Sequence, residues 1–411
     1  MFVDCAATEA VTEITADLMT GFPPSPELQV DVSNWQQPQN VRWAFRHMRE
    51  IMPTQLISAG TGRPRPLSTT RTEFGNPVVV RVDGSSSTVE EIFADTLTDA
   101  LVVVRGGEVV DERYFAGMTE TTRHLVMSVS KSVVGCVAGV LVAQGRLDPQ
   151  AAVTDYVPEV AGSGYRCARV RDVLDMRTGV AFRETYTALD SEVRIMERSV
   201  GWAPALANDP RGAYAYLATI RPEGPHGGAF TYRSADTDML GWVCERAAGE
   251  RMADLISSLI WQPMGAEFDA EITCDPVGTA IHDGGISATL RDLARFAQMI
   301  LDDGLVEGRQ AIPAAWLADT FDPAPGVREA FAQTENEAML PGGWYRNQFW
   351  FFRNEAGPIL LCLGIHGQLV FVDRASHTVI VKLSSWPDAQ SPEHLANTLR
   401  ACGAISAKLA D

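Results

Sequence analysis

One apolar stretch constrains the fold of this chain more than any other feature. Residues 133–143 contain no charged side chain and almost no polar one. A helix that is apolar on every side is a buried helix, because an amphipathic surface helix would show a polar face. Gly145 follows, and glycine commonly ends a helix. The chain must therefore fold around this helix and cover it.

Ser128 and Lys131 lie in the first turn of the same helix. Side chains three positions apart share a helical face, so the hydroxyl and the amine are expected to meet at the helix start. Backbone N–H groups there have no partner within the helix, and the helix dipole favours negative charge. A serine nucleophile needs a group that accepts its proton and donors that bind the resulting oxyanion. The helix start offers both.

Lysine is rare in this chain, which makes the pairing more specific. Lys131, Lys382 and Lys408 are the only lysines among 34 basic residues, and Ser128-x-x-Lys131 is the only motif of its kind. Burial lowers the pKa of a lysine, which can then accept a proton, whereas arginine stays charged. We therefore favour a nucleophile with its base over the alternative, a serine cap beside a lysine that reaches solvent.

Composition and charge exclude several classes of function. With 411 residues, of which 46% are hydrophobic, the chain can bury a large core and exceeds the usual size of one domain. Its net charge of −18 argues against a nucleic acid or an anionic membrane surface as partner. Seven scattered cysteines without a Cys-x-x-Cys pair are typical of reduced thiols. Residues 1–13 lack the pattern of a secretion signal, so we expect a soluble, cytoplasmic protein.

Predicted strands lie at both ends of the chain, with predicted helices between them. This order predicts an α+β fold. One sheet domain is expected from residues 1–150 and 280–411, an inserted, mainly helical domain from residues 151–279, and the active site between them. The expected elements are a hairpin at 101–115, helices at 170–176, 236–248, 251–261, 290–301 and 392–409, and strands at 348–353, 359–365, 369–373 and 378–384.

Two further segments have a composition that predicts their role. Residues 1–75 are rich in Pro, Gln, Ser and Thr, and we expect an arm that packs on the main body. Residues 177–228 combine turn-forming residues with mixed charges. An irregular segment of this length commonly forms a binding surface.

Three motifs resemble those of the serine β-lactamases and penicillin-binding proteins, in their class C and esterase branch. They are Ser128-x-x-Lys131, Tyr232-x-Ser234, and a C-terminal strand that carries Gly364. The chain is more similar still to the 6-aminohexanoate-dimer hydrolases, which cleave nylon oligomers. This resemblance implies a β-lactamase-like fold, an antiparallel sheet flanked by helices with an inserted helical domain. It rests on residues 42–45, 127–132, 155–159, 364–368 and 379–387.

The resemblance also implies a mechanism. Ser128 would attack an amide or ester carbonyl and pass its proton to Lys131, and Tyr232 would deliver a proton to the leaving amine. The backbone N–H groups of Ser128 and Ile365 would bind the oxyanion. Water would release the acyl-enzyme, and no metal or organic cofactor would be needed. A buried phenol with no catalytic part is the alternative for Tyr232.

Four more residues are implied to lie at the substrate. Tyr186 would hydrogen-bond the leaving nitrogen, and Glu197 would pair with the free ammonium of an aminohexanoate dimer. Asp283 falls among the same contacts, in a part of the family that varies. The alternative for Glu197 is a solvated surface carboxylate. His366 follows the oxyanion strand, where a supporting role is favoured over that of a general base, because no Gly-x-Ser-x-Gly motif is present.

Two departures from the wider fold narrow the prediction. Cys362-Leu363-Gly364 stands where penicillin-binding enzymes carry Lys-Thr-Gly, and Ser234 stands where they usually carry asparagine. Both changes disfavour β-lactamase or D-amino-acid peptidase activity. The sequence thus predicts a hydrolase of small linear amides or esters, with a carboxylesterase of little amidase activity as the first alternative and a non-catalytic binding protein as the second. The resemblance also implies a homodimer.

Overall fold

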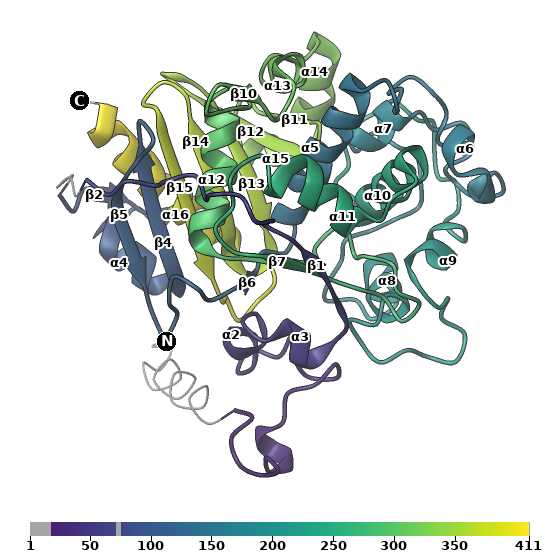
Figure 1. Cartoon of the computed structure of the whole chain (residues 1–411), viewed down its shortest axis with the longest axis horizontal. Coiled ribbons are helices and arrows are strands. Elements are labelled where there is room, and N and C mark those ends of the chain that lie inside the picture. Colours follow the sequence, from purple (N-terminus) through teal and green to yellow (C-terminus); the bar gives the residue numbers. More distant parts are fainter. Residues whose placement is uncertain (1–17, 71–74, 411) are drawn as a thin grey trace.

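An antiparallel sheet of seven strands forms the centre of the computed structural model, which describes residues 18–70 and 75–410 (Figure 1). Its strand order is β11-β12-β13-β14-β15-β4-β5. The pairing of β15 with β4, where Ile380 lies opposite Val103, joins the two ends of the chain in one sheet. The predicted α+β fold is confirmed. The strands are β4 (Thr98–Arg105), β5 (Glu108–Tyr114), β11 (Trp344–Arg346), β12 (Phe349–Asn354), β13 (Gly357–Gly364), β14 (Gln368–Asp373) and β15 (Thr378–Ser384).

Alternate residues of these strands enter two separate cores. Val102 and Val104 of β4 belong to the core that also holds α5 (Val129–Ala143) and α12 (Leu290–Leu301), whereas Leu101 and Val103 pack with α16 (Pro392–Ala410) and α4 (Val89–Asp95). Figure 1 shows α12 and α16 on opposite faces of the sheet. A strand buried on both faces needs apolar residues at successive positions, which explains its unbroken apolar run.

The apolar helix α5 lies between the sheet and the helical part of the molecule, as its composition predicts. Two glycines allow this close packing. A Cβ at Gly135 would come within 2.4 Å of the carbonyl oxygen of Asn347, and one at Gly139 within 2.6 Å of the Trp316 ring. The two glycines are four positions apart, so one face of the helix packs against both the Asn347 backbone and the Trp316 ring.

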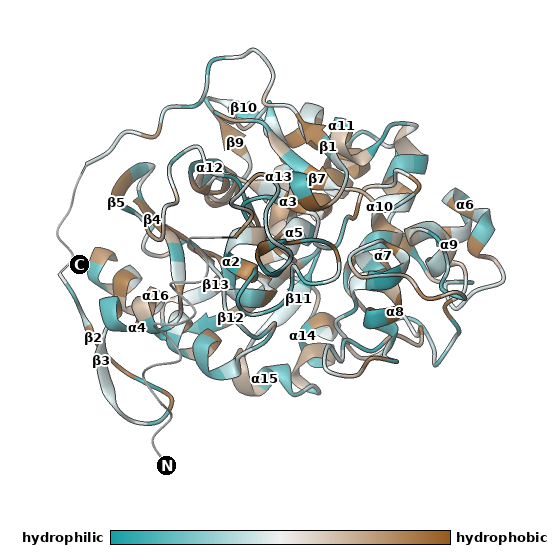
Figure 2. Cartoon of the chain, turned by 90° about the horizontal axis from the view of Figure 1, so that it is seen from below, coloured by the Kyte–Doolittle hydropathy of each residue, from teal (hydrophilic) through white to brown (hydrophobic). Residues whose placement is uncertain are grey.

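The helical part contains α6 to α11, and most of these helices are short. Figure 2 shows hydrophilic residues on α7 and α8. The π-helical turn Ser257–Trp261 continues α11. Among the described residues, none of the helices is both long and apolar enough to cross a membrane. The helices are α6 (Val153–Tyr156), α7 (Val170–Leu174), α8 (Glu192–Ser199), α9 (Ala213–Leu217), α10 (Ser234–Ala248) and α11 (Met252–Ile256).

A second sheet of four short strands was not predicted. Its order is β1-β7-β8-β6, with β1 (Thr54–Ile57), β7 (Ala270–Thr273), β8 (Ile286–Ala288) and β6 (His124–Leu125). Strands of two to four residues are too short to show an alternating pattern. Because β7 pairs with β1, the helical segment 151–279 is tied to the N-terminal part of the chain. The division into domains at residues 150 and 280 stays a prediction.

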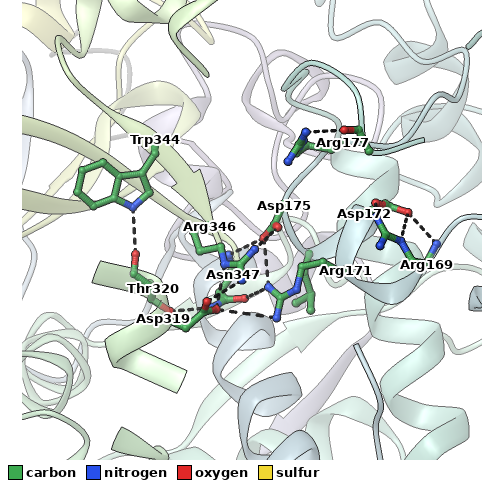
Figure 3. Close-up of polar contacts among 12 residues, drawn as sticks. Arg169, Arg171, Asp172, Asp175, Arg177, Asp319, Thr320, Trp344, Arg346 and Asn347 are labelled. Atoms are coloured by element: carbon green, nitrogen blue, oxygen red, sulfur yellow. Dashed lines mark hydrogen bonds and ion pairs between the residues drawn. The ribbon is translucent and has the colours of Figure 1, made fainter. Parts of the chain in front are cut away.

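A group of buried and partly buried charged residues joins α7 to the sheet (Figure 3). Arg346 of β11 pairs with Asp175 at 2.5 Å and with Asp319 at 2.7 Å, and Arg171 of α7 reaches Asp175 at 3.3 Å. Asp319 lies in α13 (Ala314–Phe321). Three segments far apart in the sequence are therefore held together at one point.

The described part of the N-terminal arm packs on the main body, as expected, while residues 1–17 and 71–74 lie outside the described residues. Trp35 is only 1% exposed, and its indole N–H donates to the carbonyl oxygen of Trp202 at 2.8 Å. The remaining elements are α2 (Val41–Ala44), α3 (Met48–Ile51), β2 (Val78–Val80), β3 (Ser86–Thr88), β9 (Leu305–Val306), β10 (Arg309–Gln310), α14 (Pro325–Ala332) and α15 (Asn336–Met339), with short 3-10 turns at Pro26–Leu28, Pro158–Val160 and Ile365–Gly367.

Candidate active site

Ser128 and Lys131 meet at the start of α5, as their spacing predicts. The Lys131 Nζ donates a hydrogen bond of 2.9 Å to Ser128 Oγ, one of 3.0 Å to Ser234 Oγ, and one of 2.7 Å to the carbonyl oxygen of Asp283. Lys131 is 1% exposed. All three protons of its ammonium group therefore have an acceptor, which fixes the amine against the serine hydroxyl.

The prediction that burial lowers the pKa of Lys131 is wrong. Burial by itself disfavours the ammonium, but interactions with Tyr232, Asp283 and Glu184 outweigh burial and raise the pKa of Lys131 above its usual value. The Asp283 carboxylate lies 3.5 Å from Nζ. Opposite charges at this distance favour the charged form. In its resting state Lys131 is thus a donor, and it must lose a proton before it can act as a base.

Tyr232 lies directly before α10 and beside the lysine. The Lys131 Nζ is 5.3 Å from the centre of the Tyr232 ring. Burial raises the pKa of the Tyr232 phenol, while Lys131 and Ser128 act against this rise. The ring packs against Trp350, with 5.0 Å between the centroids. The phenol is therefore held close to both the nucleophile and the amine.

Ser128 opens into a cavity of about 390 Å³, counted with the part that is open to solvent. Four of the other predicted residues, Tyr186, Glu197, Asp283 and Ile365, also line it, whereas Lys131, Tyr232 and His366 do not. The rest of the wall is mostly apolar and consists of Met127, Val193, Met196, Val200, Trp202, Ile281 and Gly284.

Ile365 was predicted to lie on a strand. It lies instead in the short 3-10 turn that follows β13. The preceding Gly364 explains how this turn reaches Ser128. A Cβ at Gly364 would approach the carbonyl oxygen of Val126 to 2.6 Å, so only glycine lets the end of β13 pack this closely. Ile365 and Ser128 thereby line the same cavity.

Glu184 belongs to the site but was not predicted from the sequence. Its Oε2 accepts a hydrogen bond of 2.8 Å from the Tyr186 hydroxyl, and its Oε1 accepts one from the backbone N–H of Ser234. Burial and Glu184 raise the pKa of the Tyr186 phenol. Glu184 thus ties the irregular segment to the start of α10. Nothing in the sequence around Glu184 distinguishes it from its acidic neighbours, because the contacts that define it are tertiary.

Glu197 and Asp283 place two acids in the cavity wall. Glu197 is 5% exposed and paired with Arg194, so the alternative of a solvated surface carboxylate is wrong. Burial raises the pKa of Glu197 to about 7 despite Arg194. Burial and the nearby Asp238 raise the pKa of Asp283 to about 6. A cation bound between the two acids would lower both pKa values and hold both groups ionised.

His366 is separated from the cavity. Its Nδ1 lies 2.7 Å from the carbonyl oxygen of Trp386, and its ring packs edge-on against Phe45 with 5.3 Å between the centroids. Burial lowers the pKa of His366 to about 4, so the imidazole is neutral. This placement favours the supporting role: His366 holds the turn that carries Ile365. A direct contact with substrate finds no support in the geometry.

Comparison with known proteins agrees with this geometry. Residues 87–405 match the beta-lactamase family. The chain is 40% identical, over 87% of its length and 88% of the relative's, to a 6-aminohexanoate-dimer hydrolase of Paenarthrobacter ureafaciens.

Solved structures give the same result for the fold. A Bacillus anthracis protein provisionally named a 6-aminohexanoate-dimer hydrolase superposes with a TM-score of 0.84 at 26% identity, over 93% of this chain and 97% of the other. A family VIII carboxylesterase superposes with a TM-score of 0.56 at 16% identity, over 77% and 96% of the two chains, and shares the fold. The chain therefore belongs to the beta-lactamase family, in the branch that includes the 6-aminohexanoate-dimer hydrolases.

Proposed function

We propose that this protein is a serine hydrolase that cleaves small linear amides and esters through an acyl-enzyme, with a 6-aminohexanoate dimer as its model amide substrate. One observation carries the proposal. A fully bonded lysine donates to Ser128 Oγ, and Ser128 lines a cavity whose other walls are mostly apolar. The relative at 40% identity supports the amide substrate.

The first step transfers the Ser128 proton as its Oγ bonds to the substrate carbonyl carbon. Lys131 accepts this proton after the pair that it forms with Tyr232 has given up one proton, because the resting ammonium cannot accept another. The carbonyl oxygen becomes an oxyanion, which the backbone N–H groups of Ser128 and Ile365 stabilise. Since the base-competent form has one proton fewer, kcat/KM should rise on the alkaline side of neutrality.

The second step breaks the bond between carbon and the leaving group. An amine must be protonated as it departs, and Tyr232, within reach of Ser128, delivers that proton. Lys131 returns a proton to the phenol. Water then attacks the acyl-enzyme ester, its proton passes to the same pair, and Ser128 Oγ regains a proton as the acid product leaves.

The wall of the cavity supports a substrate that is apolar along its chain and cationic at one end. Val193, Met196 and Trp202 offer apolar surface to the methylene groups. Glu197 and Asp283 lie in the same wall, and an ammonium would relieve the unfavourable burial of their charge. An aminohexanoate dimer has both features.

A second candidate function is that of a carboxylesterase with little amidase activity. The observation in its favour concerns Tyr186, whose hydroxyl donates to Glu184 in this structure. Assistance to a leaving nitrogen requires the hydroxyl proton or its oxygen to turn toward the cavity. An ester with a good leaving group needs no such help.

Two finer features are also part of the proposal. A cytoplasmic location is supported by the cysteines, since the six in the described residues are all free and five of them are buried. A homodimer rests on the family resemblance alone. Light scattering of the purified protein distinguishes the mass of two chains from that of one.

A substrate panel tests the function. It should contain aminohexanoate dimer, its N-acetyl derivative, a p-nitrophenyl ester of a short acid, a D-amino-acid amide and a chromogenic cephalosporin. We expect hydrolysis of the ester and the dimer, and weak or no turnover of the cephalosporin. Ester hydrolysis without amide hydrolysis would establish the carboxylesterase, and efficient cephalosporin turnover would overturn the substrate class.

A further inference from the structure

One face of α10 carries polar residues that the proposed reaction does not use directly. Ser234, Asp238, Gly241 and Glu245 follow one another at intervals of four, three and four positions, which places them on one side of the helix. Ser234 accepts a hydrogen bond from the catalytic lysine. The other three lie farther along the same face, and all three contact the side chain of His282.

His282 is 0% exposed, and its ring lies between two carboxylates. Its Nδ1 is 3.5 Å from Asp238 Oδ1, and its Nε2 is 3.7 Å from Glu245 Oε1. These distances are those of ion pairs and are too long for good hydrogen bonds. Gly241 provides the space, because a Cβ there would come within 2.2 Å of the imidazole. The helix face is thus shaped to hold a ring between two acids.

Asp238 connects this ring to the catalytic lysine. Its Oδ1 accepts hydrogen bonds from the backbone N–H groups of His282, at 2.9 Å, and of Asp283, at 3.1 Å. The carbonyl oxygen of Asp283 in turn accepts the hydrogen bond of 2.7 Å from Lys131 Nζ. Asp238 therefore fixes the backbone that supplies one of the three acceptors of the lysine.

The balance of charge explains why a histidine stands here. Asp238 is fully buried, and its Oδ2 has no hydrogen-bond partner among the described residues. A buried carboxylate without a counter-charge tends to take up a proton. Burial disfavours the imidazolium, but Asp238 and Glu245 outweigh burial and raise the pKa of His282 to about 9. At neutral pH the ring is therefore a cation that balances its two acids.

We propose that His282 is a positioning residue: its ring, buried between Asp238 and Glu245, holds the Asp238 side chain and with it the Asp283 backbone against Lys131. His282 does not line the cavity, so it acts through these residues and not on the substrate. The inference rests on the proposed function of Ser128 and Lys131.

Groups from two segments face His282. Helix α10 contributes Asp238 and Glu245, while the neighbouring Asp283 carboxylate lies against Lys131. Tyr214 of α9 lies nearly parallel to the imidazole at 6.3 Å between centroids, and its hydroxyl donates to Glu245. Burial raises the pKa of Tyr214 well above its usual range, so this phenol stays neutral. The titration of His282 is thus set by its two acids.

A pair of variants tests the role in catalysis. His282→Gln removes the positive charge and keeps a polar side chain. We expect kcat for the p-nitrophenyl ester to fall about tenfold to a hundredfold, the effect of a displaced catalytic group, with little change in KM. Adding Asp238→Asn should restore much of this loss. The amide oxygen still accepts from the two N–H groups but requires no counter-charge.

A second measurement does not depend on activity. The stabilisation that His282 gains from its acids is complete below pH 6.5 and is lost as the pH rises through about 9, because its pKa is higher in the folded chain than in the unfolded chain. The free energy of unfolding of the wild type should therefore decline over this range relative to His282→Gln. If His282→Gln does not fold, Glu245→Gln is measured instead. Removing one of the two acids should lower the pKa of His282 in the folded chain, so the free energy of unfolding should stop declining at a lower pH.

His124→Gln is the matched control. His124 is also buried beside a carboxylate, at 3.3 Å from Asp99, but has no contact with Lys131. It should lower stability but leave kcat for the p-nitrophenyl ester nearly unchanged.

Wild-type kcat in His282→Gln, or a double variant no better than the single one, would overturn the inference. So would an unchanged pH dependence of stability in both His282→Gln and Glu245→Gln. Failure of the proposed function looks different: the wild type itself would then neither hydrolyse esters nor react at Ser128.

Discussion

The chain buries two lysines in different surroundings, and their comparison explains what burial does to an amine. Lys131 has three acceptors and several acids around it. Lys382, on β15, is 0% exposed, donates to the carbonyl oxygen of Thr96 at 3.1 Å and contacts Ser384 Oγ. Burial lowers the pKa of Lys382 to about 7, whereas the pKa of Lys131 is raised.

The difference shows that neighbouring charge, and not burial alone, decides whether a buried lysine is a cation at rest. It also shows that a lowered pKa does not identify the catalytic lysine. Lys382 has the pKa of a good base but does not touch the cavity that holds Ser128. Lys131 lies against the Ser128 hydroxyl, and it becomes able to accept a proton through Tyr232.

The largest expected effect separates the two lysines directly. Lys131→Met should lower kcat/KM for an ester by about a hundredfold to ten-thousandfold, the usual contribution of acid–base catalysis. Lys131→Arg should be nearly as damaging, since arginine does not give up its proton. Lys382→Met is the matched control and should leave kcat/KM nearly unchanged. Equal losses in both methionine variants would mean that the position of Lys131 has no special role.

The next effect concerns the leaving group. Tyr186→Phe keeps the ring but removes the hydroxyl that bonds to Glu184. If this hydroxyl assists the leaving nitrogen, amide hydrolysis should fall about tenfold to a hundredfold, the size of one hydrogen bond made in the transition state. The p-nitrophenyl ester rate is the internal control. Equal losses on both substrates would show that Tyr186 only shapes the cavity.

A smaller effect is expected at Glu197, one of the two acids in the cavity wall. Glu197→Gln should raise KM for aminohexanoate dimer roughly tenfold, the value of one charged contact, and leave the N-acetyl derivative unaffected. Because the pKa of Glu197 is about 7, KM for the dimer in the wild type should fall as the pH rises from 6 to 8. Initial rates over this range measure it. A pH-independent KM would place the ammonium elsewhere.

The smallest effect is on stability. Lys382 has a pKa of about 7 in the folded chain and an ordinary one near 10.5 in the unfolded chain. The unfolded chain therefore binds the proton first, and the wild type loses stability as the pH falls from 10 to 7. Lys382→Met removes this dependence and should be more stable at pH 7 by on the order of 1 kcal/mol, after loss of two hydrogen bonds. Denaturant titrations at pH 7 and pH 9.5 check it.

The features that could be predicted from the sequence are local ones. The apolar run of α5 required burial, and Ser128 and Lys131 lie three positions apart, so their contact follows from helix geometry. The long strands near the C-terminus carry their own pattern. The fold and family followed from these motifs.

The features that escaped prediction depend on tertiary contacts. The strands β6, β7 and β8 are too short to carry a pattern. Glu184 matters only because Tyr186 and Ser234 come to it in space. The pKa of Lys131 was predicted in the wrong direction, because burial was visible in the sequence and the surrounding acids were not. The spacing of Asp238 and Glu245 around Gly241 was visible and is the signal that could have pointed to the histidine between them.

Covalent labelling can show directly whether Ser128 is the nucleophile. The protein is treated with a fluorophosphonate and analysed by intact mass, followed by peptide mapping, with and without a competing ester. We expect one adduct per chain, on Ser128, formed more slowly with the competitor and much more slowly in Lys131→Met than in Lys382→Met. An adduct on another residue would move the nucleophile elsewhere, and the absence of any adduct in the active pH range would favour a non-catalytic binding protein.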